Sequence, residues 1–457
     1  MNLFLPSGPR PLHFVGIGGA GMSALALVAL RKGLPVSGSD TDTSGCGDLL
    51  AAGAQVFSGH SAEHVDNARA VVVSAAIPPD HVEVRAAVAQ GIPVVPRKEA
   101  LAGLIGGARC VGIAGTHGKT TTTAMTTEAM AAAGFGVTGI AGGRVDAWGG
   151  NARIGGDELY VVEADEYDQA FLTLYPTIAV VNNVEADHLE CYGSLEALED
   201  AFVTFASRAE RALVGNDSPG ADRVAAQLPA ARVWRFGPGA PELRLDGIEA
   251  SASRTRATVT LPGREAVALE LQIPGVHNLR NATAALGVVV ALGGDPAPAL
   301  AALADFRGVG RRFDRLGEVA GIAIVDDYAH HPTELRATLA AARQAFPDRR
   351  LVAAFQPHLY SRTAAHSDAM GEALAAADLA VVTDVYAARE QPIPGVSGEL
   401  VATAARRRGA ATVYEPSRAA LGSRVAGLLR RGDVLLTLGA GDITQLGREV
   451  RRLLEPA

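Results

Sequence analysis

The sequence predicts an α/β fold in three domains, with a Rossmann-like domain at each end and a central α/β domain of the P-loop type. Short apolar strands alternate with helical segments along the chain, a pattern typical of parallel sheets covered by helices. Two of these strands lead directly into glycine-rich loops that open a helix, at residues 12–21 and 110–121. We place the domain boundaries accordingly, at 1–107, 108–313 and 314–457.

Length and composition are those of a globular protein. The 457 residues are 48% hydrophobic, which is enough for several independent cores. A net charge of −8 and short, scattered arginine pairs argue against nucleic acid as a partner. The chain has neither an apolar run long enough to span a membrane nor a signal-peptide core, so we expect a cytoplasmic protein. Cys46, Cys110 and Cys191 lie far apart and suggest neither a disulfide nor a thiolate metal site.

The first glycine-rich loop follows an apolar strand at 12–15 and has the pattern G-x-G-x-x-G, with glycines at 16, 18 and 21. A helix is expected over 22–30, and the next strand ends in Ser39 and Asp40, about twenty residues beyond, where a Rossmann unit places its ribose-binding acid. The strand at 70–73 ends in Ser74. A dinucleotide-dependent oxidoreductase would fit this loop equally well, and a purely structural turn also remains open.

The second loop indicates ATP chemistry. It reads Gly115-x-x-Gly118-Lys119-Thr120 rather than the strict G-x-x-x-x-G-K-[ST] pattern. Glycines let backbone N–H groups close on an anion, the ammonium supplies a point charge, and the threonine hydroxyl can bind Mg²⁺. The chain has only three lysines, of which Lys119 is one, so a compact cation is retained here although arginine is used almost everywhere else.

Carboxylates follow the strand at 159–162. Glu163 is the first candidate for a metal ligand, because acids at the carboxyl end of a parallel strand commonly face the ligand. Asp165, Glu166 and Asp168 are either ligands or solvated loop charges. His188 follows the strand at 177–181 and is a candidate neutral imidazole ligand.

Three polar residues, His277, Asn278 and Asn281, lie in the first turns of a helix that we expect to open within 274–285. They suit either a purine edge or helix capping. Arg311 and Arg312 form a glycine-flanked pair that could clamp phosphate.

Four strands of the last third end in polar clusters, which predicts a second ligand-binding site at the carboxyl edge of a parallel sheet. The cluster at 326–331 contains two acids and two histidines. Because four such groups on one turn seldom all face one ion, we do not expect a protein-held metal there.

Six motifs stand in order along the chain: HFVGIGGAGMS (13–23), GTHGKTT (115–121), EADE (163–166), EADH (185–188), GRRF (310–313) and DDYAHHP (326–332). Each motif alone is weak evidence for a protein family. The six together are specific for one family, and they span all three predicted domains. The chain resembles the Mur ligase family. The resemblance implies a UDP-sugar-binding first domain, a central ATP-binding ligase domain of the P-loop ATPase type and a C-terminal ligase domain.

The resemblance also implies an activity of peptidoglycan precursor synthesis: ligation of L-alanine to the lactyl carboxylate of UDP-N-acetylmuramate through an acyl phosphate, with ATP and Mg²⁺, by a monomer or homodimer. By resemblance, the catalytic residues are Lys119, Glu163, His188 and Arg312, and the metal ligands are Thr120, Glu163 and His188. ATP would contact Gly115, Thr116, His117, Gly118, Lys119, Thr120, Thr121, His277, Asn278 and Asn281. The other substrates would contact Gly18, Gly19, Ala20, Gly21, Ser39, Asp40, Ser74, Tyr328, His330, His358 and Arg362.

The sequence departs from the family pattern in places. Leu359 stands where arginine is commoner, and no lysine between His188 and Arg208 could serve as the carbamoylated lysine of some sister ligases. Tyr167 replaces the usual serine, as it does in muropeptide-recycling ligases. Attachment of a preformed peptide therefore stays an alternative acceptor reaction, beside the oxidoreductase and a non-catalytic nucleotide-sensing module.

Overall fold

The structure is a computed structural model that describes the chain except residues 1–2, 7, 253, 389 and 456–457. It divides into two compact units. The first consists of Met1–Asp246, Thr258–Leu269 and Arg280–Ala304, and the second of Gly247–Ala257, Glu270–Leu279 and Asp305–Ala457.

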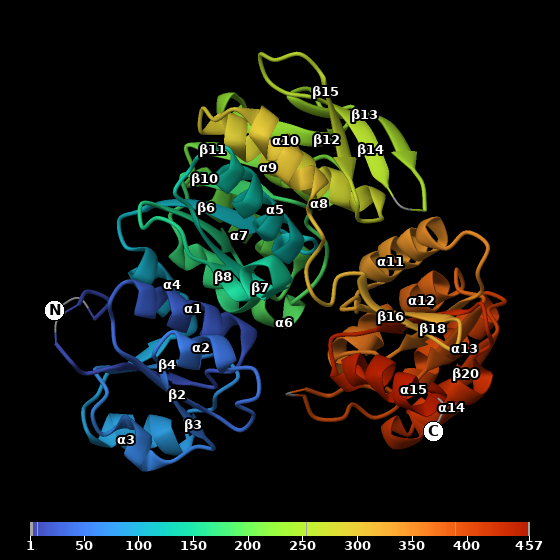
Figure 1. The fold of residues 1–457 in the computed structure, drawn as a ribbon, viewed down its shortest axis with the longest axis horizontal. Helices are drawn as coiled ribbons and strands as arrows, with labels where there is room; N and C mark the ends of the chain where they lie inside the picture. Colours follow the sequence, from blue (N-terminus) through green and yellow to red (C-terminus); the bar gives the residue numbers. More distant parts are fainter. Residues whose placement is uncertain (1–2, 7, 253, 389, 456–457) are drawn as a thin grey trace. The chain divides into compact units, whose positions relative to one another are not determined.

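The first sheet has five parallel strands in the order β3-β2-β1-β4-β5 (Figure 1, blue). Strand β1 is fully buried, and the chain reverses its direction of winding between β1 and β4. The turn after β1 therefore lies at the switch point where open α/β sheets bind ligands. The elements are β1 Leu12–Val15, α1 Ala20–Arg31, β2 Val36–Asp40, α2 Gly47–Ala51, β3 Gln55–Ser58, η1 Ala62–Val65, β4 Ala70–Val73, α3 Val82–Ala89, β5 Val94–Pro96 and α4 Arg97–Ile105.

The second sheet has ten strands in the order β15-β14-β13-β12-β11-β10-β6-β9-β7-β8. Strand β6 lies between β10 and β9 and is parallel to both, so the loops that follow these three strands meet at one edge. The elements up to β10 are β6 Arg109–Ala114, α5 Lys119–Ala132, β7 Thr138–Val145, η2 Asp146–Trp148, β8 Gly150–Arg153, β9 Leu159–Glu163, η3 Tyr167–Thr173 and β10 Ile178–Val181. The remaining ones are α6 Leu189–Tyr192, α7 Leu195–Ser207, β11 Arg211–Gly215, α8 Pro219–Ala226, η4 Ala230–Arg232, β12 Val233–Pro238, β13 Leu243–Ala250, β14 Thr255–Thr260, β15 Val267–Leu271, α9 Val276–Ala291 and α10 Pro296–Ala304.

Within the first unit, the two sheets share a hydrophobic core. Helix α1 packs against β7 and β8, and one apolar cluster contains both Leu25 of α1 and Ile140 of β7. The amide of Asn151 adds a hydrogen bond of 3.0 Å to the carbonyl oxygen of Ala20. The glycine turn of the first sheet is thereby held against the central sheet.

The third sheet, in the second unit, has the order β16-β17-β21-β18-β19-β20, and only the pairing of β16 with β17 is antiparallel among its described pairs. Alternate residues of β17 enter two different cores, since Val325 packs with the residues of α11–α13 and Ile324 with those of α14 and α15. Helices therefore cover both faces. The elements are β16 Asp314–Val319, β17 Ile322–Asp327, α11 Pro332–Ala345, β18 Leu351–Phe355, α12 Tyr360–Leu374, β19 Leu379–Val382, α13 Gly398–Arg407, β20 Thr412–Tyr414, α14 Arg418–Leu428, β21 Val434–Leu438, η5 Asp442–Gln445 and α15 Leu446–Leu454.

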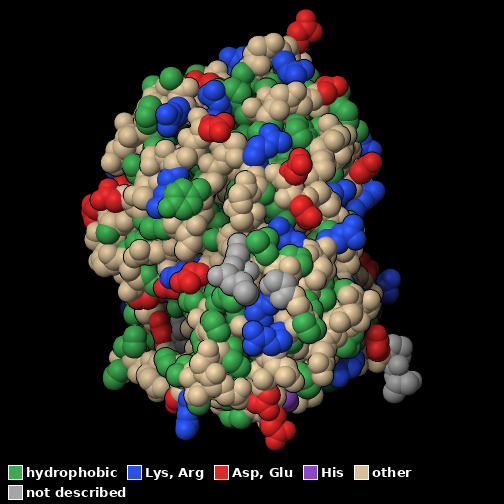
Figure 2. Space-filling view, turned by 90° about the vertical axis from the view of Figure 1, so that its left-hand side faces the viewer, with side chains coloured by type: hydrophobic (Ala, Val, Ile, Leu, Met, Phe, Trp, Pro, Cys, Tyr) green, Lys and Arg blue, Asp and Glu red, His purple; other side chains and the backbone are tan. Residues whose placement is uncertain are grey.

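The predicted α/β class is confirmed. The second sheet starts at Arg109 and the third at Asp314, and we propose the domain boundaries 1–107, 108–313 and 314–457. Acidic and basic side chains are interspersed over the face drawn in Figure 2. None of the helices in the described part of the chain is both long and apolar enough to cross a lipid bilayer.

Candidate active site

The loop between β6 and α5 has the conformation of a phosphate cradle. Gly115 and Gly118 have φ angles of +135° and +79°, which side chains rarely tolerate. A Cβ atom on Gly115 would lie 2.9 Å from the Cβ of Asn182, and one on Gly118 would lie 3.0 Å from Oδ1 of Asn281. Helix α5 begins at Lys119 directly after the loop, so its N–H groups point toward the position expected for an anion.

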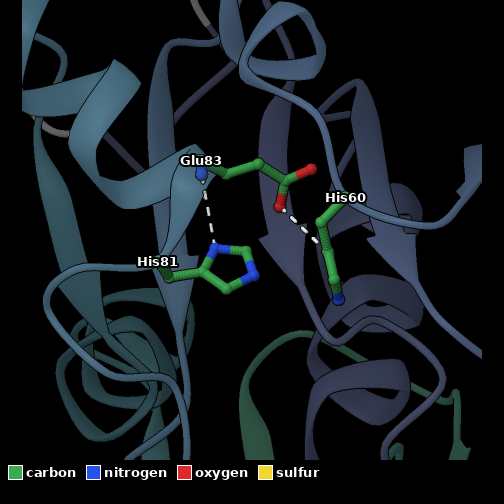
Figure 3. Close-up of side chains that lie close together, drawn as sticks. All are labelled: His60, His81 and Glu83. Carbon is green, nitrogen blue, oxygen red and sulfur yellow. Dashed lines mark hydrogen bonds and ion pairs between the residues drawn. The ribbon is translucent and has the colours of Figure 1, made fainter.

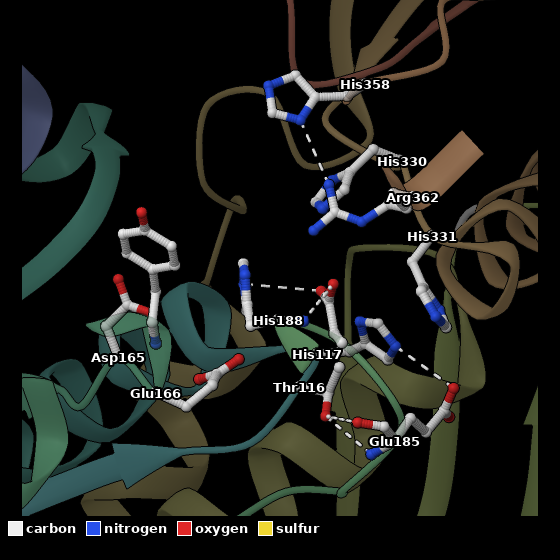
Figure 4. Close-up of polar contacts among 12 residues, drawn as sticks. Thr116, His117, Asp165, Glu166, Glu185, His188, His330, His331, His358 and Arg362 are labelled. Carbon is white, nitrogen blue, oxygen red and sulfur yellow. Dashed lines mark hydrogen bonds and ion pairs between the residues drawn. The ribbon is translucent and has the colours of Figure 1, made fainter. Parts of the chain in front are cut away.

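Two asparagines that follow β10 hold the loop in place. The backbone N–H of His117 donates to Oδ1 of Asn183 at 2.8 Å, and the amide of Asn182 donates to the carbonyl oxygen of His117 at 3.2 Å. The backbone N–H of Glu185 donates to the hydroxyl of Thr116 at 2.9 Å, as Figure 4 shows. Sequence analysis assigned no role to Asn182 or Asn183, because the contacts join segments about 65 residues apart.

The ammonium group of Lys119 lies among oxygen atoms, and its side chain is 14% exposed. It donates to the carbonyl oxygens of Gly115 at 2.7 Å and Thr116 at 3.3 Å, and to Oε1 of Glu166 at 2.8 Å. Burial lowers the pKa of Lys119, but the charges of Glu166 and Asp165 outweigh this and raise it above its ordinary value. The lysine is therefore a permanent cation at the start of α5.

One carboxylate oxygen of Glu166 accepts no hydrogen bond from the described residues. Its side chain is 1% exposed, and Oε2 has no hydrogen-bond partner among the described residues. A buried carboxylate oxygen without a donor is costly unless a cation or water satisfies it. Glu163, at the end of β9, accepts a hydrogen bond of 2.6 Å from the backbone N–H of Gly142. The acidic loop thus offers the oxygen ligands that Mg²⁺ prefers.

His188 lies beside this loop. It has a φ angle of +54°, and its ring packs edge-on against Tyr167 at 5.2 Å between centroids. Burial lowers the pKa of His188, but its hydrogen bond with Glu190 and the charges of Asp187 and Glu166 outweigh this and raise it. The raised pKa means that a proton competes with a metal ion for this imidazole more strongly than for an ordinary histidine.

The three predicted adenine contacts all lie in the first turns of helix α9, on either side of the boundary between the two units. Asn281 lies in the first unit, and its side chain approaches Gly118 as noted above. His277 and Asn278 belong to the second unit. There the amide of Asn278 donates to the carbonyl oxygen of Pro274 at 2.7 Å, which ties the start of α9 to the residues before it.

In the N-terminal domain, Asp40 supports the glycine turn. Its Oδ2 accepts the N–H of Gly18 at 2.9 Å, and its Oδ1 accepts the N–H of Asp42 at 3.1 Å. The hydroxyl of Ser39 is buried and donates to Glu83 at 2.6 Å. Both predicted substrate contacts are thus already bonded to the protein, while Ser74 directly follows β4 beside β1.

Glu83 is the centre of a buried network that sequence analysis missed. Its carboxylate accepts from His64 at 2.8 Å as well as from Ser39, and it lies 3.3 Å from Nδ1 of His60. The backbone N–H of Glu83 donates to Nδ1 of His81 at 3.3 Å (Figure 3). Since protein donors satisfy the carboxylate, we interpret the cluster as a structural tie among β2, η1 and α3.

In the second unit, five predicted residues gather at the end of β17. Arg312 lies 5.0 Å from the ring of Tyr328, which contacts His330. The ring of His330 lies 5.9 Å from that of His358, and His358 hydrogen-bonds to Arg362 at 3.3 Å (Figure 4).

Two acids and a leucine complete this end of the second unit. Asp326 binds Arg311 and Thr437, and Asp327 accepts the N–H groups of Phe313 and Ala329. Burial raises the pKa of Asp327 to about 6, against the opposing charge of Arg312. Leu359 is buried at the start of α12.

The fold and the loop at Lys119 define a multidomain α/β protein of the P-loop type, with acidic side chains beside the glycine loop. The chain belongs to the Mur ligase family. The model "Mur ligase family, catalytic domain" matches residues 11–109, "Mur ligase middle domain" matches 113–289, and "Mur ligase, glutamate ligase domain" matches 311–441.

Several curated relatives share one name, and this chain aligns with them over nearly their whole length. The chain is 44% identical over 444 residues to the UDP-N-acetylmuramate--L-alanine ligase of Nitratidesulfovibrio vulgaris, covering 96% of this chain and 98% of that one. It is likewise 44% identical to the ligase of the same name from Salinibacter ruber, covering 98% and 95%. A crystal structure of UDP-N-acetylmuramate-alanine ligase from Thermotoga maritima superposes with a TM-score of 0.83 at 30% identity, covering 97% and 99%.

Proposed function

We propose that the chain joins L-alanine to the lactyl carboxylate of UDP-N-acetylmuramate in an ATP-dependent step of peptidoglycan precursor synthesis. The observation that carries the proposal is Lys119, a largely buried cation at the start of α5 inside a left-handed glycine loop. This arrangement suits a nucleoside triphosphate. The curated relatives, which are named for this reaction, supply the identity of the acceptor and the amino acid.

In the first step, a lactyl carboxylate oxygen attacks the γ-phosphorus of ATP, the bond to the β-phosphate oxygen breaks, and ADP leaves. The carboxylate becomes an acyl phosphate. The protein mainly positions the two reactants and stabilises charge. Lys119 and the N–H groups at the start of α5 neutralise the phosphate oxygens, and Asn182 and Asn183 keep the loop in shape.

The acidic loop fits Mg²⁺, since Glu166 leaves a buried carboxylate oxygen without a partner among the described residues. Thr120, Glu163 and His188 would hold the ion, which supplies positive charge to the phosphate oxygens when bound.

In the second step, the amine of L-alanine attacks the acyl carbon, an amide forms and inorganic phosphate leaves. Tyr328, His330, His358 and Arg362 are proposed to orient the lactyl group and the amino acid, and Arg312 to contact phosphate. Their packing around β17 and α12 gives the second unit a polar surface suited to anionic groups.

Attachment of a preformed peptide is the second candidate. The observation that favours it is Tyr167, whose ring packs against His188 where the family usually has serine. A coupled ADP-release assay with UDP-N-acetylmuramate and ATP separates the candidates when L-alanine, glycine, L-serine and a preformed tripeptide with a free N-terminal amine are offered in parallel. Turnover with L-alanine alone supports the main proposal, whereas preference for the tripeptide overturns it.

A further inference from the structure

Strand β7 lies in the central sheet between β8 and β9, and β9 is the strand that ends in Glu163. The parallel pairing of β7 with β9 extends to Ile140. On the other side of β7, the antiparallel pairing with β8 is irregular between Ile140 and Val145. Gly142 lies in this irregular stretch, and a glycine at such a place commonly marks a bulge or the close approach of another group to the backbone.

The carboxylate of Glu163 lies directly on the backbone of Gly142. The N–H of Gly142 donates to Oε2 of Glu163 at 2.6 Å, which is a charge-assisted hydrogen bond. A Cβ atom on Gly142 would lie 2.6 Å from Oε1, 2.7 Å from Oε2 and 2.8 Å from Cδ of that side chain. Any side chain at position 142 would therefore displace the carboxylate. The hydrogen bond leaves Oε1 without a partner among the residues that the structure describes.

A second glycine of β7 has a different neighbour. A Cβ atom on Gly139 would lie 2.5 Å from Oγ1 and 2.6 Å from Cγ2 of Thr127, a buried residue of α5. Gly139 thus lets the strand pack closely against the helix, which is a structural role. Gly142 is exposed and has no left-handed φ, and its nearest neighbours are the end of one flexible side chain. We therefore expect the fold to tolerate alanine at 142 better than at 139.

We propose that Gly142 is a positioning residue for the metal site: its bare backbone holds one oxygen of Glu163 and so presents the other to the divalent cation that binds with ATP. The inference rests on the proposed function, in which Glu163 is a ligand of Mg²⁺. Groups that orient a metal ligand contribute to metal affinity although they do not touch the ion. Gly142 acts in this way, through Glu163.

The test is binding of the β,γ-imido analogue of ATP, measured by calorimetry during a titration with Mg²⁺ and again with EDTA in place of Mg²⁺. No acceptor is present, so there is no turnover. We expect Gly142→Ala to raise the Mg²⁺ concentration for half-maximal analogue binding about 10-fold or more, which is the usual cost of losing a group that orients a metal ligand. Analogue affinity in EDTA should stay at the wild-type value.

Gly136→Ala is the matched control, because a Cβ atom at this position just before β7 would make an ordinary contact of 3.8 Å with Gly156. The double variant Gly142→Ala with Glu163→Gln tests the route of the effect. If Gly142 acts through Glu163, the double variant has the same Mg²⁺ dependence as Glu163→Gln alone. Thermal unfolding verifies that each variant is folded, and Gly139→Ala is expected to be the least stable.

Wild-type Mg²⁺ dependence in folded Gly142→Ala would overturn the proposal, and so would an equal shift in Gly136→Ala. A loss of analogue affinity in EDTA that equals the loss in Mg²⁺ would show that the substitution acts on the nucleotide site and not on the metal. A double variant with a further loss beyond Glu163→Gln would show that Gly142 does not act through Glu163. Failure of the wild-type protein to bind the analogue, or to bind it more tightly with Mg²⁺, would instead count against the proposed function.

Discussion

Replacing Glu83 by glutamine tests whether the buried network at the centre of the N-terminal domain stabilises the fold. The side chain is fully buried, and burial alone would raise its pKa. The imidazole of His13, whose Nε2 lies 3.7 Å from the carboxylate, and hydrogen bonds from Ser39 and His64 outweigh burial and lower the pKa of Glu83 from 4.5 to about 2. At ~1.4 kcal/mol per pKa unit, this shift corresponds to roughly 3 kcal/mol of stability at neutral pH.

The direction of the pH dependence follows from the sign of the shift. Because the pKa of Glu83 is lower in the folded state, the contribution is fully present above about pH 4.5 and is lost as the pH falls toward about 2. We therefore expect Glu83→Gln to unfold in urea at a clearly lower concentration than wild type at pH 7. The difference should narrow as the pH is lowered through this window.

Circular dichroism follows the unfolding, and hydrogen exchange in β1 and β2 assigns the transition to the N-terminal domain. Glu63→Gln is the control, since Glu63 is an exposed acid on the neighbouring η1. Unchanged stability of Glu83→Gln at pH 7, or an equal loss in Glu63→Gln, would refute the argument.

Three further substitutions address the phosphate loop and the metal. Gly118→Ala places a side chain at a φ of +79° and against Asn281, so we expect a cost of about 1–2 kcal/mol and weak ATP binding, measured by calorimetry; wild-type affinity would contradict the loop geometry. Asn182→Ala removes the hydrogen bonds to His117 and Thr122 and should raise the KM for ATP about 5- to 30-fold; an unaltered KM would show that these bonds do not hold the loop in shape. His188→Ala should raise the Mg²⁺ concentration for half-maximal activity about 10-fold or more, and an unchanged metal titration would reject the ligand assignment.

Local patterns predicted those parts of the site that lie within one strand and the loop after it. The phosphate loop was predicted from residue spacing alone, because its parts are adjacent in sequence. They are strand β6, the glycines at 115 and 118 and the start of α5 at Lys119. Glu163 was found because an acid follows the apolar strand β9, which pairs directly with β6.

Contacts between distant segments were not predictable in the same way. The partner of Lys119 is Glu166, one of three loop acids that sequence analysis could not rank, and the pairing depends on how β9 lies beside β6. Asp40 was predicted as a ribose ligand from its position, but both of its oxygens accept backbone N–H groups.

The most direct test of the account is ADP release that depends on both UDP-N-acetylmuramate and L-alanine, compared between Lys119→Ala and Lys98→Ala. The account predicts that Lys119→Ala loses at least about 100-fold in kcat, because the cation at the phosphate loop is gone, whereas Lys98→Ala keeps wild-type turnover. Near-normal turnover in folded Lys119→Ala would contradict it.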